Sequence, residues 1–221
     1  QTRGREIHRN MDQVLAEVRD LARQGTIEIE FLGQTVNAYR DAAGRTLATL
    51  LEHGSRVEGI PRLRFTNPHP AQMTPAPIDS MAAAQPVVCP YLHLPVQSGS
   101  SSVLKAMRRG YDRDAYLEKI AQLRRRIPGI ALGTDIIVGF PGETEEDFEA
   151  TMDVVRRARF ASAFTFQYSP RPGTPAAEMD NQIPKEIVQE RFERLVALQD
   201  SIQAEENATL VGTDVELLVQ A

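Results

Sequence analysis

The sequence predicts an α/β fold in which helices cover a parallel sheet. Five segments with strand character alternate with amphipathic helical segments, at a spacing of roughly 30 residues that matches a βα repeat unit. One of them, 130–138, is apolar almost throughout, as in a strand that is covered on both faces. A barrel and a doubly wound sheet both satisfy these observations, and both place their chemistry at the carboxyl ends of the strands.

The periodicity predicts each element in chain order. Alternating or continuous apolar residues predict strands at 27–31, 63–66, 91–96, 130–138 and 163–168. Helical spacing predicts helices around 47–51, from Pro184 onward and after four capping positions, which are Asn10, Thr74, Asp112 and Thr144. A parallel sheet that begins with a helix is unusual, so a further strand is expected before Gln1. The alternating run at 212–221 predicts the first strand of another unit.

Composition places the chain among globular proteins. Of its 221 residues, 42% are hydrophobic and 25% are charged, which is enough apolar surface for a full core. No apolar run approaches the roughly 18 residues of a membrane helix, and the start has no signal-peptide pattern. A cytoplasmic protein without a membrane partner is expected. The single cysteine, Cys89, excludes an internal disulfide and any metal site built from several thiolates of this chain.

The charge balance argues against a generally basic nucleic-acid binder, since the formal net charge is −5. Arginines nevertheless cluster, and a local basic face is compatible with that total. The clusters are Arg3/Arg5/Arg9, Arg108/Arg109/Arg113, Arg124–Arg126 and Arg156/Arg157/Arg159. For the last two clusters, solvated helix faces are the favoured interpretation.

Small and polar residues follow every expected strand. The five ends read Gly-Gln-Thr-Val-Asn from 33, Thr-Asn-Pro-His-Pro from 66, Pro-Val-Gln-Ser-Gly-Ser from 95, Gly-Phe-Pro-Gly-Glu from 139 and Tyr-Ser-Pro-Arg-Pro-Gly from 168. Amides, hydroxyls and bare glycine backbone suit a polar ligand with ribose hydroxyls, a base edge and a carboxylate. These ends lack a Ser/His/acid set, a zinc pattern and a phosphate-binding loop. We therefore expect a binding cavity without catalytic groups or metal ligands from this chain.

Several long motifs resemble one family, over nearly the whole chain. PYLHLPVQSGS at 90–100, VLKAMRRGY at 103–111, residues 134–148 and YSPRPGTPA at 168–176 closely resemble the radical S-adenosylmethionine methylthiotransferases. LGQTVNAY at 32–39 is similar to the LGQNVNAY signature of the tRNA branch, with Thr35 in place of the usual Asn. The branch that acts on a ribosomal protein has a Gln-His pair where this chain has Gln97-Ser98.

The resemblance implies a partial (β/α) barrel in which a [4Fe–4S] cluster cleaves S-adenosylmethionine to a 5′-deoxyadenosyl radical. The radical abstracts hydrogen from the adenine of an isopentenylated tRNA adenosine adjacent to the anticodon, and a methylthio group is inserted there. A second S-adenosylmethionine supplies the methyl group, an auxiliary cluster is associated with sulfur delivery, and flavodoxin or ferredoxin donates electrons. The family's Cys-x-x-x-Cys-x-x-Cys loop directly precedes a segment like Thr2–Glu6. The cluster ligands and the first barrel strand are therefore expected outside this chain, and a fragment with this sequence is expected to be inactive.

The resemblance also implies which residues bind the cofactor. The expected set is Gln34, Asn37, Thr66, Gln97, Ser98, Asp135, Ile137, Gly139, Tyr168 and Ser169. Gln34 and Asn37 are alternatives for the methionine amino group, and at Gly139 the backbone is expected to approach the adenine. Asp135 is either structural or a ribose ligand, since a buried carboxylate needs a partner. Glu143 is expected to serve the turn or helix cap.

The remaining expectations concern RNA, domains and alternatives. Arg3, Arg5 and Arg171 are expected at the barrel mouth, where they contact tRNA phosphate or the cofactor carboxylate. Residues 1–209 are expected to form the radical core and 210–221 to begin an RNA-binding TRAM barrel. One alternative is a cluster-less module that binds S-adenosylmethionine or RNA. The other is a methylthiotransferase for ribosomal protein or another tRNA adenosine.

Overall fold

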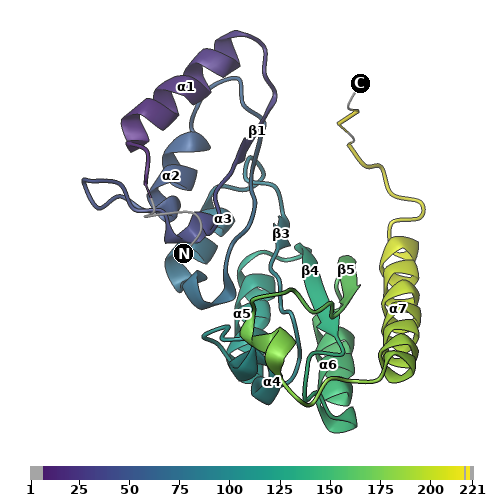
Figure 1. The fold of residues 1–221 in the computed structure, drawn as a ribbon. Helices are drawn as coiled ribbons and strands as arrows, with labels where there is room; N and C mark the ends of the chain where they lie inside the picture. The colour runs from purple at the N-terminus through teal and green to yellow at the C-terminus, as the bar shows by residue number, and fades with distance from the viewer. Residues whose placement is uncertain (1–6, 217, 220–221) are drawn as a thin grey trace.

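The structure is a computed structural model that describes residues 7–216, 218 and 219. Helices and strands alternate along the chain, with a second helix after the third strand (Figure 1). In order, they are α1 (Met11–Arg23), β1 (Glu28–Phe31), α2 (Leu47–Gly54), β2 (Arg62–Phe65), α3 (Pro75–Ala83), β3 (Tyr91–His93), α4 (Ser101–Ala106), α5 (Arg113–Arg126), β4 (Ala131–Val138), α6 (Glu145–Ala158), β5 (Ser162–Gln167) and α7 (Lys185–Ala208). Short 3₁₀ turns occupy Val36–Ala38, Pro70–Gln72 and Pro175–Glu178.

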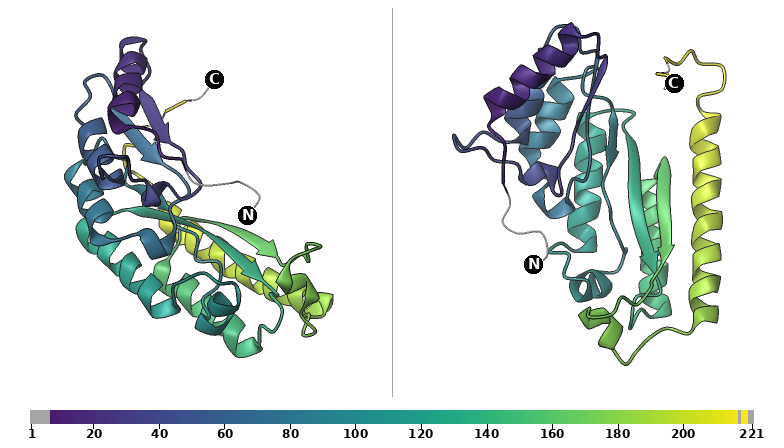
Figure 2. Two further views of the ribbon diagram at one scale, coloured as in Figure 1. Left: turned by 60° about the vertical axis from the view of Figure 1, so that its left-hand side comes forward. Right: turned by 45° about the horizontal axis from the view of Figure 1, so that its top comes forward.

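All five strands run parallel and lie in sequence order. β1 pairs with β2 from Glu28 opposite Arg62, and β4 lies between β3 and β5. The two groups are joined through Leu63, which donates to the carbonyl of Val87 (2.7 Å) and accepts from the amide of Cys89 (3.0 Å). The helices cover one side of this curved surface, and its concave side is open (Figure 2). The predicted parallel α/β fold is confirmed, in the form of a curved, open sheet.

The third strand is shorter than predicted, since β3 ends at His93 and not at residue 96. Pro95 has no amide hydrogen, and the amide of Val96 donates to the Thr134 hydroxyl (2.9 Å) instead of to a carbonyl of β4. Pairing resumes at a single bridge between Gln97 and Ile136. Between the end of β3 and Gln97, a side-chain hydroxyl therefore takes the place of the backbone ladder.

The hydrophobic core lies between the sheet and its helices. In β4, Leu132, Ile136 and Val138 are buried against helical residues such as Phe148, which is also fully buried. The alternate residues of β4 face the concave side. There the sheet carries charged and aromatic side chains, and Phe164 and Phe166 of β5 are 61% and 51% exposed. The concave face is therefore a surface on which side chains remain accessible.

All four predicted helix starts, at Asn10, Thr74, Asp112 and Thr144, are confirmed, and one helix was not predicted. Asn10 accepts from the amides of Asp12 and Gln13, and Thr144 forms a full capping box with Asp147. The unpredicted helix is α4, which begins after Ser100. With six residues, it is too short for periodicity to reveal.

After α7 the described residues form turns and irregular chain. The strand expected over 212–221 is not seen in the part of that segment that the structure describes. A strand needs a hydrogen-bonding partner, and no described segment pairs with these residues. Within the described residues, no helix has the length and apolar character needed to cross a membrane.

Candidate functional site at the carboxyl ends of the strands

The backbone brings the five strand ends side by side. The amide of Thr66 donates to the carbonyl of Phe31 (3.1 Å), and the side chain of Asn67 donates to the carbonyl of Gly33 (3.0 Å). Farther along, the amide of Gln97 donates to the carbonyl of Asp135 (2.8 Å), and the carbonyl of Gln97 accepts from the amide of Ile137 (2.9 Å). The amide of Tyr168 donates to the carbonyl of Val138. The ends of β1 and β2 are thus linked to each other, and so are the ends of β3, β4 and β5. These five carboxyl ends together are called the mouth here.

Asn37 joins two of these ends. Its side-chain amide donates to the carbonyl of His69 (2.9 Å), and its oxygen accepts from the amide of the same residue (2.9 Å). His69 in turn caps the turn that follows it, because its Nδ1 accepts from Ala71. Asn37 is 9% exposed, so the structure gives its amide a structural role. Of the two alternatives for the methionine amino group, Gln34 is the exposed one.

Ser98 also lies inside the protein. Its hydroxyl accepts from the amide of Ser100 and lies 3.4 Å from the hydroxyl of Thr151 in α6, with no exposed surface. The neighbouring Gly99 donates its amide to the same Thr151 hydroxyl (2.9 Å), and a Cβ on Gly99 would lie 2.5 Å from the backbone of Ala150. The loop after β3 is thus packed directly on a helix backbone, and Ser98 supports it without reaching the mouth.

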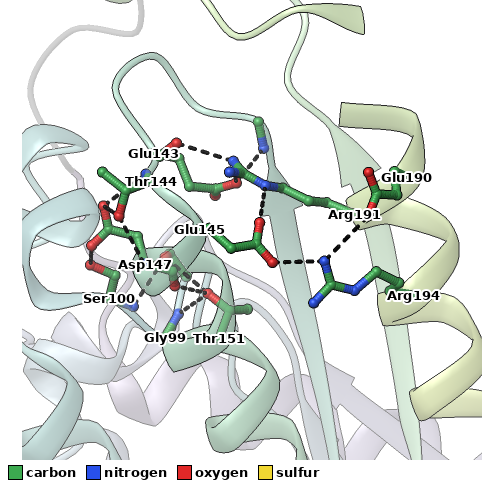
Figure 3. A network of polar contacts seen from close by, with 12 residues as sticks. Gly99, Ser100, Glu143, Thr144, Glu145, Asp147, Thr151, Glu190, Arg191 and Arg194 are labelled. Carbon is green, nitrogen blue, oxygen red and sulfur yellow. Dashed lines mark hydrogen bonds and ion pairs between the residues drawn. The ribbon is translucent and has the colours of Figure 1, made fainter. Parts of the chain in front are cut away.

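The turn after β4 is held by a buried ion pair (Figure 3). The carboxylate of Glu143 accepts from the amide of Gly139 (3.1 Å) and from Nη1 of Arg191 in α7 (2.9 Å). Burial raises the pKa of Glu143, and the Gly139 amide and the Arg191 guanidinium act against that rise. Gly139 has a φ of 76°, and a Cβ there would lie 2.5 Å from Val188 of α7. Helix packing therefore accounts for this glycine, and the expected turn role of Glu143 is seen.

A second network joins the loop after β3 to the start of α6 (Figure 3). The hydroxyls of Ser100 and Ser102 donate to one oxygen of Asp147, at 2.5 and 2.7 Å. The other oxygen accepts from the amide and hydroxyl of Thr144. Burial opposes these donors, but the pKa of Asp147 remains below its ordinary value because they favour the carboxylate. Two neighbouring strand ends are thus tied to one helix start.

Asp135 is less buried than predicted. Its side chain is 30% exposed on the concave face, and one oxygen lies 3.0 Å from Nε2 of His93. Because β4 alternates its faces, Asp135 lies among the accessible residues and not among the core residues next to it. A Cβ on Gly133 would lie within 3.1 Å of polar atoms of Tyr91, His93 and Ser162. The side chains of Tyr91, His93, Asp135 and Ser162 are together called the polar floor below the mouth.

The other predicted site residues lie at the mouth or next to it. Thr66 and Ile137 are half-buried, Gln97 is 7% exposed, and Ser169 and Arg171 are exposed. The hydroxyl of Tyr168 is buried without a hydrogen-bond partner in the described structure, and its ring packs edge-on against Phe140. Arg3 and Arg5 lie outside the described residues.

The described residues contain no group of three or more His, Cys, Asp or Glu side chains that could hold a metal ion. Cys89 is a buried free thiol. The prediction that this chain supplies no cluster of thiolate ligands follows already from its single cysteine.

Comparison with known proteins identifies the family. The model of the "Radical SAM superfamily" matches residues 1–155. The chain belongs to this superfamily. A tRNA-2-methylthio-N(6)-dimethylallyladenosine synthase of Corynebacterium jeikeium is 57% identical over 99% of the chain, and one of Mycobacterium marinum is 56% identical over 99%. The chain spans 44% of the length of each of these relatives.

Solved structures show the same fold at low sequence identity. The radical SAM enzyme coproporphyrinogen III oxidase of Escherichia coli superimposes with a TM-score of 0.60 at 16% identity, over 87% of this chain and 46% of that one. Methylornithine synthase superimposes with a TM-score of 0.51 at 15% identity, over 97% of this chain and 67% of that one. The radical SAM fold of this chain is thus supported independently of the close relatives.

S-adenosylmethionine and a [4Fe–4S] cluster are the cofactors of the superfamily, and the mouth fits the first of them. Gln34 is exposed at the mouth, and the buried hydroxyl of Tyr168 lacks a partner. A buried polar group without a partner costs about 1–3 kcal/mol, which a polar ligand there would offset. The single cysteine does not fit the cluster, whose usual ligands are several thiolates.

Sequence reasoning missed the role of Arg191. It lies on the buried face of α7 with Val188 and Leu195, three and four residues away, and is 5% exposed. The signal that could have revealed this role is a cation within the apolar stripe of a helix. Such a cation is expected to be buried, and buried charges are paired. Its partner, 48 residues away, has no signature in the sequence.

Proposed function

We propose that the longer protein containing this chain methylthiolates N6-dimethylallyladenosine in tRNA, next to the anticodon, by radical chemistry. The observation that carries this proposal is the 54–57% identity, over 98–99% of the chain, to enzymes named for that product. The matched region includes every strand end of the mouth. The cluster, when bound by the rest of the protein, supplies the radical that removes hydrogen from the substrate. The residues of this chain bind, orient and shield the reactants.

The finer assignments are part of the same proposal. Gln34, Thr66, Gln97, Ile137, Gly139, Tyr168 and Ser169 contact S-adenosylmethionine, and Asp135 contacts it from the polar floor. Asn37 and Ser98 act by holding the neighbouring loops, in line with their burial. Arg3, Arg5 and Arg171 contact tRNA phosphate. Flavodoxin or ferredoxin donates the electron, and the protein is cytoplasmic.

The proposal also includes parts of the fold that lie outside the described residues. A further parallel strand pairs with the free edge of β1, and the segment from 210 leads into a TRAM barrel. A groove of about 780 Å³ runs between α1 and β1, along residues 26–35. Its lining includes apolar side chains of both elements, among them Val14, Leu21 and Ile29, together with polar ones such as Glu17 and Glu30. An unpaired strand edge beside a partly apolar groove is suited to one more strand.

Expression of the intact gene in a strain that lacks this tRNA modification tests the function. Mass spectrometry of tRNA nucleosides should show methylthiolated dimethylallyladenosine. If soluble protein with its clusters loaded gives only the unmodified dimethylallyladenosine, the tRNA assignment is wrong. Recovery of the modification on a ribosomal protein in that strain would support the alternative substrate.

A further inference from the structure

Three cations at the carboxyl-terminal end of α4 have no acidic partner, and we propose that they bind phosphate groups of the tRNA substrate. They are Lys105, Arg108 and Arg109, named here the α4 rim. The inference rests on the proposed function, because that function makes tRNA the partner. It adds the surface that meets the RNA backbone and the chemistry by which it does so.

Most other arginines of the described helices are already neutralised. Arg124 donates to backbone carbonyls, and five more pair with carboxylates, namely Arg125 with Glu118, Arg126 with Asp79, Arg156 with Glu149, Arg157 with Asp153 and Arg159 with Glu205 and Glu206. The two clusters predicted to be helix faces therefore have satisfied charges. Within residues 7–216, 218 and 219, the side chains of Lys105, Arg108 and Arg109 form neither an ion pair nor a hydrogen bond. Their charge remains available to an external anion.

Arg109 is not simply a solvated side chain. It is half-buried, and its Nε is buried without an acceptor in the described structure. His69 and Tyr111 lie beside it, with their rings 5.6 Å apart. Burial lowers the pKa of His69, and the positive charge of Arg109 lowers it further. Because Arg109 has an unsatisfied donor and no ion-paired carboxylate among the described residues, its guanidinium favours an incoming anion.

The backbone of the α4 rim is also unusual. Arg108 has a φ of 57°, a left-handed conformation that costs a residue other than glycine about 1–2 kcal/mol. Gly110 follows with a φ of 71°, and no atom lies within 4 Å of the position its Cβ would take. The turn therefore borders open space. The nearby Asp112 is engaged in capping α5, where it accepts from the amide of Ala115 (2.8 Å).

The α4 rim adjoins the mouth. The Tyr111 hydroxyl donates to the carbonyls of Pro95 (3.2 Å) and Val96 (3.0 Å), immediately before the strand-end residue Gln97. His69 belongs to the loop after β2. A phosphate bound at the rim would thus lie beside two strand ends. Such contacts fix the position of the RNA and supply affinity without reading its sequence.

The test uses the intact cluster-loaded protein and an anticodon stem-loop that carries dimethylallyladenosine. Binding is measured by fluorescence anisotropy at several salt concentrations for Arg108→Gln, Arg109→Gln and the double variant. Each lost phosphate contact should weaken binding and reduce the slope of log K against log salt by about 0.7–0.9. A stem-loop of unrelated sequence should show the same reduction. Arg125→Gln, whose arginine is paired with Glu118, is the matched control and should leave the slope unchanged.

Two further measurements separate the possible outcomes. Arg109→Lys retains the charge and should retain most of the slope, whereas a purely structural arginine would give lower thermal stability with an unchanged slope in both variants. S-adenosylmethionine binding should be unaffected in every variant. If the wild-type protein binds and modifies tRNA but the slopes of the Gln variants are unchanged, the proposed phosphate binding by the α4 rim is wrong and the proposed function stands. A wild-type protein that neither binds nor modifies tRNA would refute the proposed function itself.

Discussion

Glu143 and Arg191 form an ion pair that is almost completely withdrawn from solvent, with 1% and 7% of their side chains exposed. The pair joins the turn after β4 to α7, and its carboxylate also holds the amide of Gly139. It is therefore a buried contact that fixes one wall of the mouth to the last helix.

Loss of Arg191 should be among the most destabilising single changes. Arg191→Met leaves the Glu143 carboxylate buried without its cation, which typically costs about 3–5 kcal/mol. Urea denaturation of the intact protein measures the change. Arg56→Met is the control, since Arg56 pairs with Glu52 at the surface and such pairs contribute about 0–1 kcal/mol. Similar losses for the two variants would contradict the structural role of the buried pair.

Gly139 should be sensitive because of α7. In Gly139→Ala the new Cβ meets Val188, and the positive φ adds a cost of about 1–2 kcal/mol. Adding Val188→Ala removes the clash, so the double variant should be more stable than the sum of the single changes predicts. A further variant, Gly139→Val, tests cofactor approach, and its S-adenosylmethionine affinity should fall. Unchanged affinity in a folded Gly139→Val protein would leave helix packing as the sole role of this glycine.

The hydroxyl of Thr151 should be needed for the loop after β3. Thr151→Val keeps the shape but leaves the buried amide of Gly99 without an acceptor, at a cost of about 1–3 kcal/mol. Thr165→Val, in β5, removes a hydroxyl that makes no hydrogen bond among the described residues and should change stability by less than about 0.5 kcal/mol. Thermal unfolding of both variants compares them directly, and equal melting temperatures would count against the Thr151 contact.

His69 should titrate below the ordinary histidine range. Burial and Arg109 both lower the pKa of its imidazole, and its Nδ1 must be unprotonated to accept from Ala71. The folded state therefore binds this proton less readily than the unfolded state. The associated stability is present above pH 6.5 and is lost as the pH falls toward the folded-state value. NMR titration of the ring should show the lowered pKa. Arg109→Gln should raise the pKa of His69 only part of the way back to its ordinary value, because the burial remains.

The fold was largely predictable because its signals are local. Strand and helix periodicities lie within single segments, and the caps at Asn10 and Thr144 need only three further residues. The early end of β3 was not predictable, because it depends on a hydroxyl 38 residues away in β4. The mouth followed from the parallel topology, since strand ends of one sheet meet at one edge.

Individual roles within the mouth depended on tertiary partners. Asn37 has the residue type of a ligand contact, but His69, 32 residues later, takes both hydrogen-bonding groups of its side chain. Asp135 was expected to be buried because its neighbours are apolar, yet strand alternation places it on the accessible face. Sequence patterns indicate which side chains are polar, whereas only packing decides which of them remain free.

The length of α7 separates the mouth from the segment that follows the helix. The helix begins beside the mouth, where Val188 adjoins Gly139 (Figure 1). Near its far end, Glu205 and Glu206 accept hydrogen bonds from Arg159, which lies just before β5. Its 24 residues measure about 36 Å at the helical rise. The carboxyl end of α7 therefore lies about one helix length from the proposed cofactor site at the mouth. Under the proposed function, an RNA that contacted both the mouth and the segment after α7 would have to span that distance, which favours a folded stem over a short single strand.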